Sequence, residues 1–229
     1  MNKSTNDERE QRILDAAANL FVHYGYDKTA VSDIAREAGI SKGAIYLHFK
    51  SKDELLEALI IRETERYAET WLERINADPN GGTIGGMYKN MLYALKSSPF
   101  MAATFRKDGR ILGNYLRKPG NFFQAADSKQ NSRYDFVKMM QEAGAVREDI
   151  SPEIIAHIMN MIGYGLIAMS DIMPQENIPP TNDIIEGIAL IMDSALTPVG
   201  YSNNETGKAI LNQIADTRRQ QHLENSDEG

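Results

Sequence analysis

The chain has 229 residues, of which 42% are hydrophobic, and its formal net charge is −7. This length is enough for one large hydrophobic core or two smaller ones. The absence of cysteine excludes a disulfide framework, a thiolate nucleophile and a cysteine-ligated zinc site.

Three short helices are predicted near the N-terminus. An apolar stripe over residues 13–24 indicates the first helix, which ends at Gly25. The second is expected over residues 31–38, and it ends at Gly39, which can adopt the left-handed conformation. Ser41 can cap the third helix, in which Ile45 and Phe49 point inward. Two helices around a short glycine-containing turn predict a helix-turn-helix, whose second helix enters the DNA major groove.

The segment KTAVSDIAREAGISKGAIYLHFKSKDEL resembles the signature of the tetracycline-repressor (TetR) family of bacterial regulators, and the similarity covers about residues 9–56. The resemblance implies a small N-terminal DNA-binding domain, followed by a helical domain that dimerises and binds an effector. It implies phosphate contacts by Thr29, His48 and Lys52. It also implies contacts with base edges by Lys42, Gly43, Ala44 and Tyr46, with an apolar contact added by Leu47.

The negative net charge is unevenly distributed along the chain. Residues 1–50 contain seven basic and seven acidic side chains, so the whole surplus of acid follows residue 50. Basic side chains flank the motif at Lys28, Lys42, Lys50 and Lys52. A local basic face of this kind predicts specific DNA binding that depends strongly on salt. Few side chains can read bases by hydrogen bonds, so much of the sequence specificity is expected to come from DNA shape.

The remainder of the chain reads as helices without any alternating strand pattern. The capping-box pattern Ser51-x-x-Glu54 begins a long helix that runs to about Ile75. Further helices are expected over residues 84–96, 99–107, 111–116, 122–143, 152–172, 181–196 and 206–222, with caps at Ser98 and Thr181. The predicted fold class is all-α. The predicted domains are residues 1–50 for DNA binding, 51–200 for effector binding and dimerisation, and 201–229 for a C-terminal helix and charged tail.

Methionine and aromatic residues recur at helical spacings after residue 70. Most are expected to belong to the core, and some to line a pocket for a small, largely apolar effector. The candidate pocket residues are Trp71, Met87, Met91, Phe105, Phe136, Met140, His157 and Tyr164. His157 is the polar candidate, although a histidine on an apolar helix is more often structural.

The helices at 152–172 and 181–196 are apolar over more than one face, which favours a homodimer in which they form half of a four-helix bundle. The alternative is a buried central helix in a monomer. The candidate interface residues are Ile155, Ile158, Ile162, Ile185, Ile188 and Met192. Two half-sites on DNA also favour a dimer, and so a palindromic operator is expected.

The polar N-terminal segment lacks the apolar run of a signal peptide. Residues 154–169 are too short and too polar to span a bilayer. Together these features predict a cytoplasmic protein without a membrane partner. The four histidines show no metal spacing, and no catalytic constellation is evident, so neither a cofactor nor an enzyme is expected. The predicted function is a ligand-responsive transcriptional repressor. The alternatives are a helical sensor that has lost DNA binding and an effector-modifying enzyme.

Overall fold

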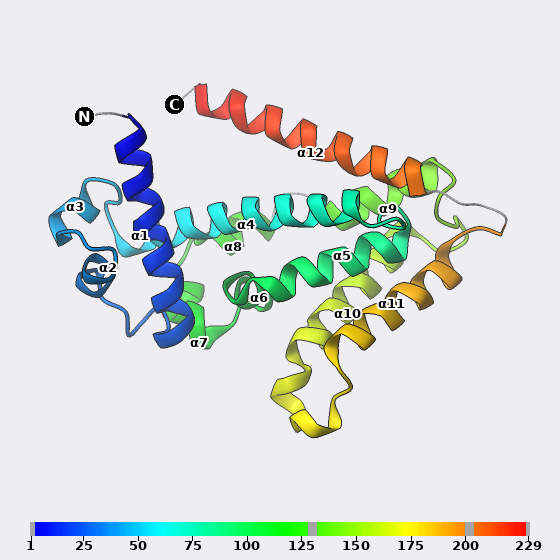
Figure 1. Cartoon of the computed structure of the whole chain (residues 1–229), viewed down its shortest axis with the longest axis horizontal. Coiled ribbons are helices and arrows are strands. Elements are labelled where there is room, and N and C mark those ends of the chain that lie inside the picture. The colour runs from blue at the N-terminus through cyan, green and yellow to red at the C-terminus, as the bar shows by residue number, and fades with distance from the viewer. Residues whose placement is uncertain (1–2, 128–131, 200–203, 228–229) are drawn as a thin grey trace. The chain divides into compact units, whose positions relative to one another are not determined.

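A computed structural model describes residues 3–127, 132–199 and 204–227. Over these ranges the chain forms twelve α-helices and two short 3₁₀ helices, with no strand among the described residues (Figure 1). The all-α prediction is confirmed.

The chain divides into two compact units, and the first comprises residues 1–67 and 98–129. Its helices are α1 (Lys3–Tyr24), α2 (Val31–Glu37), α3 (Lys42–Tyr46), the first part of α4 (Lys52–Ala77), α6 (Pro99–Arg106), α7 (Gly109–Leu112), the 3₁₀ helix η1 (Gly113–Arg117) and α8 (Phe122–Asp127). Helix α1 packs against α2, α6 and α7, and α2 packs against α3. Their apolar stripes meet in one core that includes Phe21, Ile34, Ile45, Leu56 and Tyr115.

The second unit comprises residues 68–97 and 130–229. Its further helices are α5 (Ile84–Ser97), α9 (Ser132–Glu142), α10 (Pro152–Ile172), the 3₁₀ helix η2 (Gln175–Asn177), α11 (Thr181–Leu196) and α12 (Asn204–Asp227). Helix α5 packs against α11, and α9 packs against both α10 and α12. The carboxylate of Asp193 on α11 accepts hydrogen bonds from the Gly85 amide at 2.7 Å and the Thr83 hydroxyl at 3.0 Å, which fixes the start of α5.

Helix ends follow the predicted chemistry at most places. Ser98 accepts a hydrogen bond from the Met101 amide at 3.2 Å, as the predicted cap of α6 requires. Thr181 is not a cap, because α11 already begins there and Pro180 occupies the capping position. The helix predicted over 111–116 is divided into α7 and η1, since Gly113 lies at a φ of 54° and interrupts the α-helical turn. The single helix predicted over 122–143 appears as α8 and α9, and residues 128–131 between them lie outside the described ranges.

The first compact unit extends well beyond the domain boundary predicted at residue 50. The turn that follows α1 is joined to α7, since the Tyr26 amide donates to the Ile111 carbonyl at 2.8 Å. Leu112, Tyr115 and Phe123 enter the same core as the helix-turn-helix. The motif that carries the family resemblance ends near residue 56, but packing of the same unit continues through residues that lie far along the chain.

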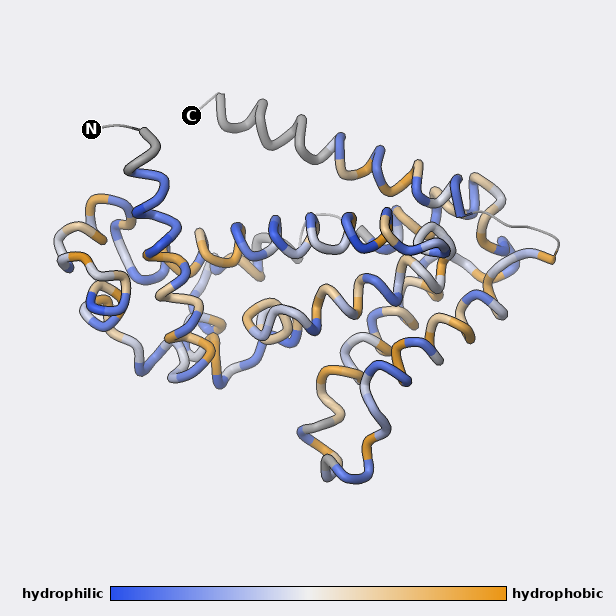
Figure 2. Tube along the Cα trace, viewed as in Figure 1, coloured by the Kyte–Doolittle hydropathy of each residue, from blue (hydrophilic) through white to orange (hydrophobic). Residues whose placement is uncertain are grey.

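The sequence alone suggested that residues 154–169 are too short and too polar to span a bilayer, but α10 as a whole meets both criteria. Over Pro152–Met169 its mean hydropathy is 1.2, which is sufficient by length and composition to cross a bilayer, and only 22% of that window is buried in this chain. Figure 2 shows hydrophobic residues recurring along α10 and α11. These helices therefore carry apolar surface that their own chain does not cover.

Candidate DNA-binding surface

The turn between α2 and α3 is built as the sequence predicts. Gly39 lies at a φ of 67°, the left-handed conformation that ends α2. The Ser41 hydroxyl accepts a hydrogen bond from the Ala44 amide at 3.2 Å and so caps α3. Ile45 and Phe49 are buried and anchor α3 in the core. The opposite face of α3 is thereby turned to solvent.

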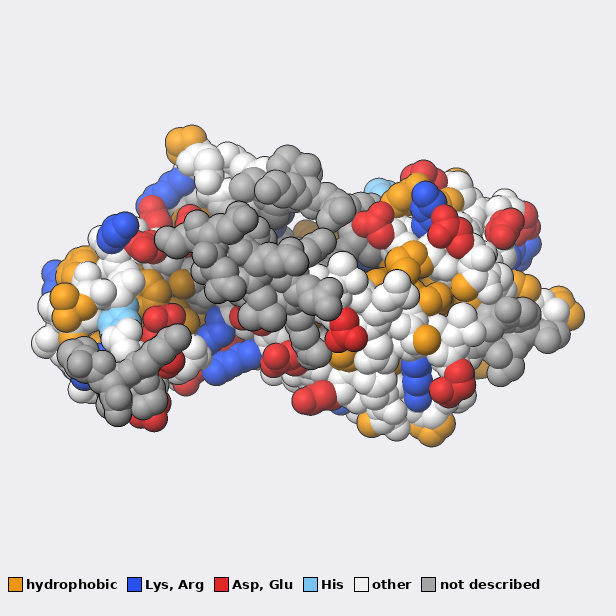
Figure 3. All heavy atoms as spheres, turned by 90° about the horizontal axis from the view of Figure 1, so that it is seen from above, with side chains coloured by type: hydrophobic (Ala, Val, Ile, Leu, Met, Phe, Trp, Pro, Cys, Tyr) orange, Lys and Arg blue, Asp and Glu red, His pale blue; other side chains and the backbone are white. Residues whose placement is uncertain are grey.

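The outward face of α3 carries the side chains predicted to meet base edges. Lys42, Gly43, Tyr46 and Leu47 are exposed, and Ala44 is half-buried. The Lys42 ammonium lies 5.9 Å from the centre of the Tyr46 ring, within the range of a cation–π contact. One face of the molecule, shown in Figure 3, has basic and acidic side chains interspersed, so the charge on that face is mixed.

Three residues expected to hold DNA phosphates are engaged within the protein instead. Thr29 is only 3% exposed, and its hydroxyl donates to the Gly25 carbonyl at 2.8 Å. The Lys52 ammonium donates to the carbonyls of Tyr26 at 2.8 Å and Thr29 at 3.0 Å, and it lies 4.0 Å from the centre of the Tyr26 ring. The side chain of His48 is 5% exposed, with Nδ1 lying 3.6 Å from a carboxylate oxygen of Glu10. Their side chains do not reach outward in this structure.

Lys52 belongs to a polar cluster that joins the turn after α1 to the start of α4. Lys118 donates to both carboxylate oxygens of Asp53, at 2.7 and 2.6 Å, and the Tyr26 hydroxyl also donates to Asp53. Burial raises the pKa of the Asp53 carboxyl, but the hydrogen bonds from Lys118 and Tyr26 outweigh burial and leave this pKa below its usual value. Burial also lowers the pKa of Lys52. We call Tyr26, Lys52, Asp53 and Lys118 the turn latch.

A second set of contacts holds the same turn against α7 and η1. The Asp27 carboxylate accepts from the Asn114 amide at 3.0 and 3.2 Å. A Cβ on Gly25 would lie 2.4 Å from the Arg110 carbonyl oxygen, and one on Gly113 would lie 2.5 Å from the Asp27 carboxylate. The contact at Gly25 is with backbone and requires glycine, and Gly113 has a positive φ that favours glycine, so the chain at residues 110–114 fits the turn closely. The sequence signal for this joint was weak, because its partners lie about 90 positions apart.

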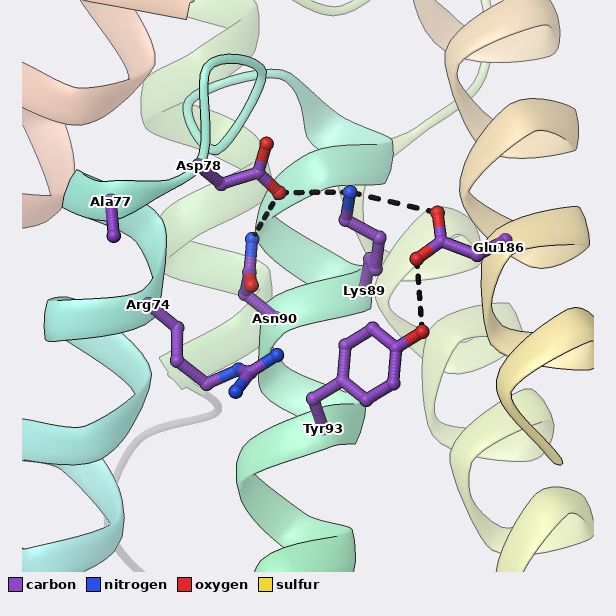
Figure 4. A pocket seen from close by; sticks show the side chains of 7 residues that line it. All are labelled: Arg74, Ala77, Asp78, Lys89, Asn90, Tyr93 and Glu186. Carbon is purple, nitrogen blue, oxygen red and sulfur yellow. Dashed lines mark hydrogen bonds and ion pairs between the residues drawn. The ribbon is translucent and has the colours of Figure 1, made fainter.

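The second unit contains a charged hollow of about 410 Å³ between the end of α4, α5 and α11 (Figure 4). Lys89 forms ion pairs with Asp78 at 2.8 Å and Glu186 at 3.6 Å. The Tyr93 hydroxyl donates to Glu186 at 2.9 Å, and the Arg74 guanidinium lies 4.8 Å from the Tyr93 ring centre. Burial lowers the pKa of Lys89, but its bond with Asp78 outweighs burial and leaves this pKa raised. The charged side chains of this hollow are largely paired with one another, and these pairs connect the end of α4, α5 and α11.

The residues predicted to line an apolar effector pocket have separate environments. Met87, Met91, Phe136 and Met140 are buried core residues. The Trp71 indole donates to the Met87 carbonyl at 3.0 Å. His157 and Tyr164 are exposed on α10, and Phe105 belongs to the first compact unit rather than the second. Helical spacing selected four core residues together with exposed ones, and it does not distinguish core positions from cavity walls.

Half of the predicted dimer residues belong to the core of their own chain. Ile155, Ile185 and Met192 are buried by their own chain, whereas Ile158 is exposed and Ile162 and Ile188 are half-buried. The exposed apolar side chains of these two helices are Ile154, Ile158, Met161, Tyr164, Met169 and Ile172 on α10, and Leu190 and Ile191 on α11. Both helices have two apolar faces, and the sequence alone does not indicate which face points outward.

No group of three or more metal-binding side chains is present among the described residues.

Comparison with known proteins agrees with this geometry. Residues 13–59 match the family model of bacterial regulatory proteins of the tetR family. The HTH-type transcriptional repressor Rv1474c of Mycobacterium tuberculosis is 30% identical over 160 residues, which cover 70% of this chain and 81% of that protein. The A-factor receptor protein of Streptomyces griseus is 29% identical over 161 residues, which cover 69% of this chain and 54% of the receptor. The transcriptional regulator FadR of Bacillus subtilis, solved in complex with stearoyl-CoA, shares the fold with a TM-score of 0.61 and 18% identity, over 80% of this chain and 97% of FadR.

Proposed function

We propose a function for this chain on the basis that it belongs to the tetR family of bacterial regulatory proteins. The proposal is a cytoplasmic repressor that binds a palindromic operator as a homodimer. A small, largely apolar effector releases it from DNA. The observation that carries the proposal is the outward face of α3. It presents Lys42, Gly43, Tyr46 and Leu47 to solvent on a helix whose other face is anchored in the core. A helix held in this way can enter the major groove without rearrangement.

The proposed DNA contacts are narrower than those that the resemblance implied. Lys42, Gly43, Ala44, Tyr46 and Leu47 are proposed to meet bases and nearby phosphates. Thr29, His48 and Lys52 have inward-facing side chains, and their proposed part is to position the helix-turn-helix. Lys52 does so by binding two carbonyls of the turn that precedes α2.

A homodimer is supported by the uncovered apolar faces of α10 and α11. Their exposed side chains recur at spacings of three and four, as at Ile154, Ile158 and Met161, which forms one stripe along α10. A Cβ on Gly165 or on Gly187 would meet nothing within 4 Å, so the fold of the single chain does not require glycine at either position. Glycines on such faces allow helices of two subunits to approach closely.

Release by an effector would result from thermodynamic linkage between ligand binding and DNA binding. A ligand that binds better to the conformation incompatible with the operator lowers DNA affinity by its differential affinity for the two states. The methionines Met87, Met91 and Met140 give the second unit an adaptable interior, which favours a largely apolar ligand. FadR, which shares this fold, was solved with stearoyl-CoA, a ligand whose acyl chain is apolar, and this supports an effector with an apolar part.

The test is to incubate the purified protein with fragmented DNA from its source organism and to sequence the bound fragments at near-physiological salt. Enrichment of one palindromic sequence is expected. A Lys42→Ala/Tyr46→Ala variant should lose this enrichment, whereas Lys138→Ala, which removes an exposed lysine of α9, should retain it. If the wild-type protein enriches nothing, with or without cell extract as a source of ligand, a sensor without DNA binding replaces the proposal.

A further inference from the structure

We infer that α3 identifies its half-site largely by thymine methyl groups, with Leu47 as the principal contact. The inference rests on the proposed function and specifies the chemistry of its DNA partner. In the major groove only thymine presents a methyl group among the four unmodified bases, and an apolar side chain can detect it. The residues of α3 that face outward are suited to this form of recognition.

Leu47 is the most exposed large side chain on this surface. It is 81% exposed, although Ile45 and Phe49, the apolar residues on either side of it, are buried. An isolated exposed leucine is ordinary on a protein surface. This one directly follows α3 and lies next to Tyr46, in the part of the chain proposed to enter the groove. Contact with a methyl group would remove apolar surface of both partners from water.

Gly43 lacks a structural reason to be glycine. A Cβ there would have the Ser41 hydroxyl oxygen at 3.9 Å as its only close neighbour, and the residue is not among those with a positive φ. Glycine within a helix costs roughly 0.5–1 kcal/mol relative to alanine. The free space therefore benefits an external partner, which it allows to approach the backbone of α3. Ala44, beside it, offers a methyl group to that partner.

Hydrogen-bond readout is correspondingly sparse. Between Lys42 and Leu47, only Lys42 and Tyr46 carry side chains that form hydrogen bonds. The Lys42 ammonium lies close to the Tyr46 ring, where it can also neutralise phosphate. Two polar side chains cannot distinguish every base of a half-site, and the apolar side chains are left to supply further discrimination.

The test uses the operator recovered by DNA selection, with each thymine of a half-site replaced singly by uracil. This replacement removes only the methyl group. The wild-type protein should lose about fourfold in affinity at one or two positions in each half-site. The variant Leu47→Ala should bind the thymine operator about fourfold more weakly, and it should lose little further affinity when the same thymines become uracil.

Ile61→Ala is the matched control, because it truncates another exposed apolar side chain of the same unit on α4. It should respond to uracil as the wild-type protein does. Selective binding by the wild-type protein with equal affinity for thymine and uracil at every position would overturn this inference and leave the proposed function intact. Equal uracil sensitivity in Leu47→Ala and wild-type protein would overturn the role of Leu47. Absence of any selective DNA binding would reject the proposed function itself.

Discussion

Glu10 places a carboxylate beside the surface proposed to meet DNA, with its Oε2 lying 3.6 Å from His48 Nδ1. A negative charge here repels nearby phosphates and holds His48 inward. Glu10→Gln should therefore raise operator affinity, by up to about fivefold, with a larger gain at low salt. Fluorescence anisotropy at two ionic strengths measures this effect. Glu148→Gln, an exposed change in the second unit, should have no effect, and equal or weaker DNA binding by Glu10→Gln would contradict the argument.

At the scale of single residues, alanine substitutions at Gly25 and Gly39 can distinguish the cost of backbone strain from that of a steric clash. Gly25 and Gly39 both have positive φ, so alanine at either position incurs a strain of roughly 1–2 kcal/mol. Only at Gly25 would the new Cβ also collide with a backbone carbonyl, that of Arg110. Urea unfolding should show that Gly25→Ala loses about 1–3 kcal/mol more stability than Gly39→Ala. Equal losses would show that the joint between the turn and α7 adapts readily.

At the scale of elements, the turn latch should make stability depend on pH. The pKa of Asp53 is lowered in the folded state, so its ionised form stabilises the fold above its unfolded pKa of about 4. This contribution is lost as the pH falls through the lower folded-state pKa. Asp53→Asn should cost about 1 kcal/mol at pH 7, a modest value because Asp53 and Lys118 are partly exposed, and the difference should shrink below pH 4.

Denaturant unfolding of Asp53→Asn and wild-type protein at pH 7 and pH 3 measures this dependence. Lys118→Gln should cost a similar amount at pH 7, and the double variant should cost less than the two single losses combined, since each breaks the same pair. A stability difference for Asp53→Asn that is constant from pH 7 to pH 3 would contradict the latch.

Sequence patterns predicted elements whose cause is local. Ser41 and Gly39 determine the ends of α2 and α3 by capping and backbone conformation, and both could be identified from neighbouring residues. The turn latch depends on Lys118, which lies 65 positions after Asp53, and no local pattern reports such a distance. Phosphate contacts were assigned to Thr29, His48 and Lys52 by resemblance and by side-chain chemistry, and the inward contacts of these side chains could be seen only in the folded chain.

At the scale of the whole molecule, the open question is what covers the apolar faces of α10 and α11. Periodicity showed that both helices are apolar on two faces, but it selected Ile155 and Ile185, which their own chain buries. Ile158 and Ile191 are the better representatives of the outward faces, since both remain exposed. A hydrophobic surface on this scale usually marks an association site. A second copy of the chain would also supply the second half-site contact.

Ile158→Glu and Ile191→Glu should each convert the protein from a dimer to a monomer, because a carboxylate buried in an apolar interface has no partner. Sedimentation equilibrium should give twice the chain mass of 25.6 kDa for wild-type protein and the chain mass itself for both variants. Affinity for the full operator should fall at least about tenfold, since each monomer binds one half-site without help from the other. Ile61→Glu adds the same charge on α4 and should remain dimeric. A variant that stays dimeric with full operator affinity would place the subunit contact elsewhere.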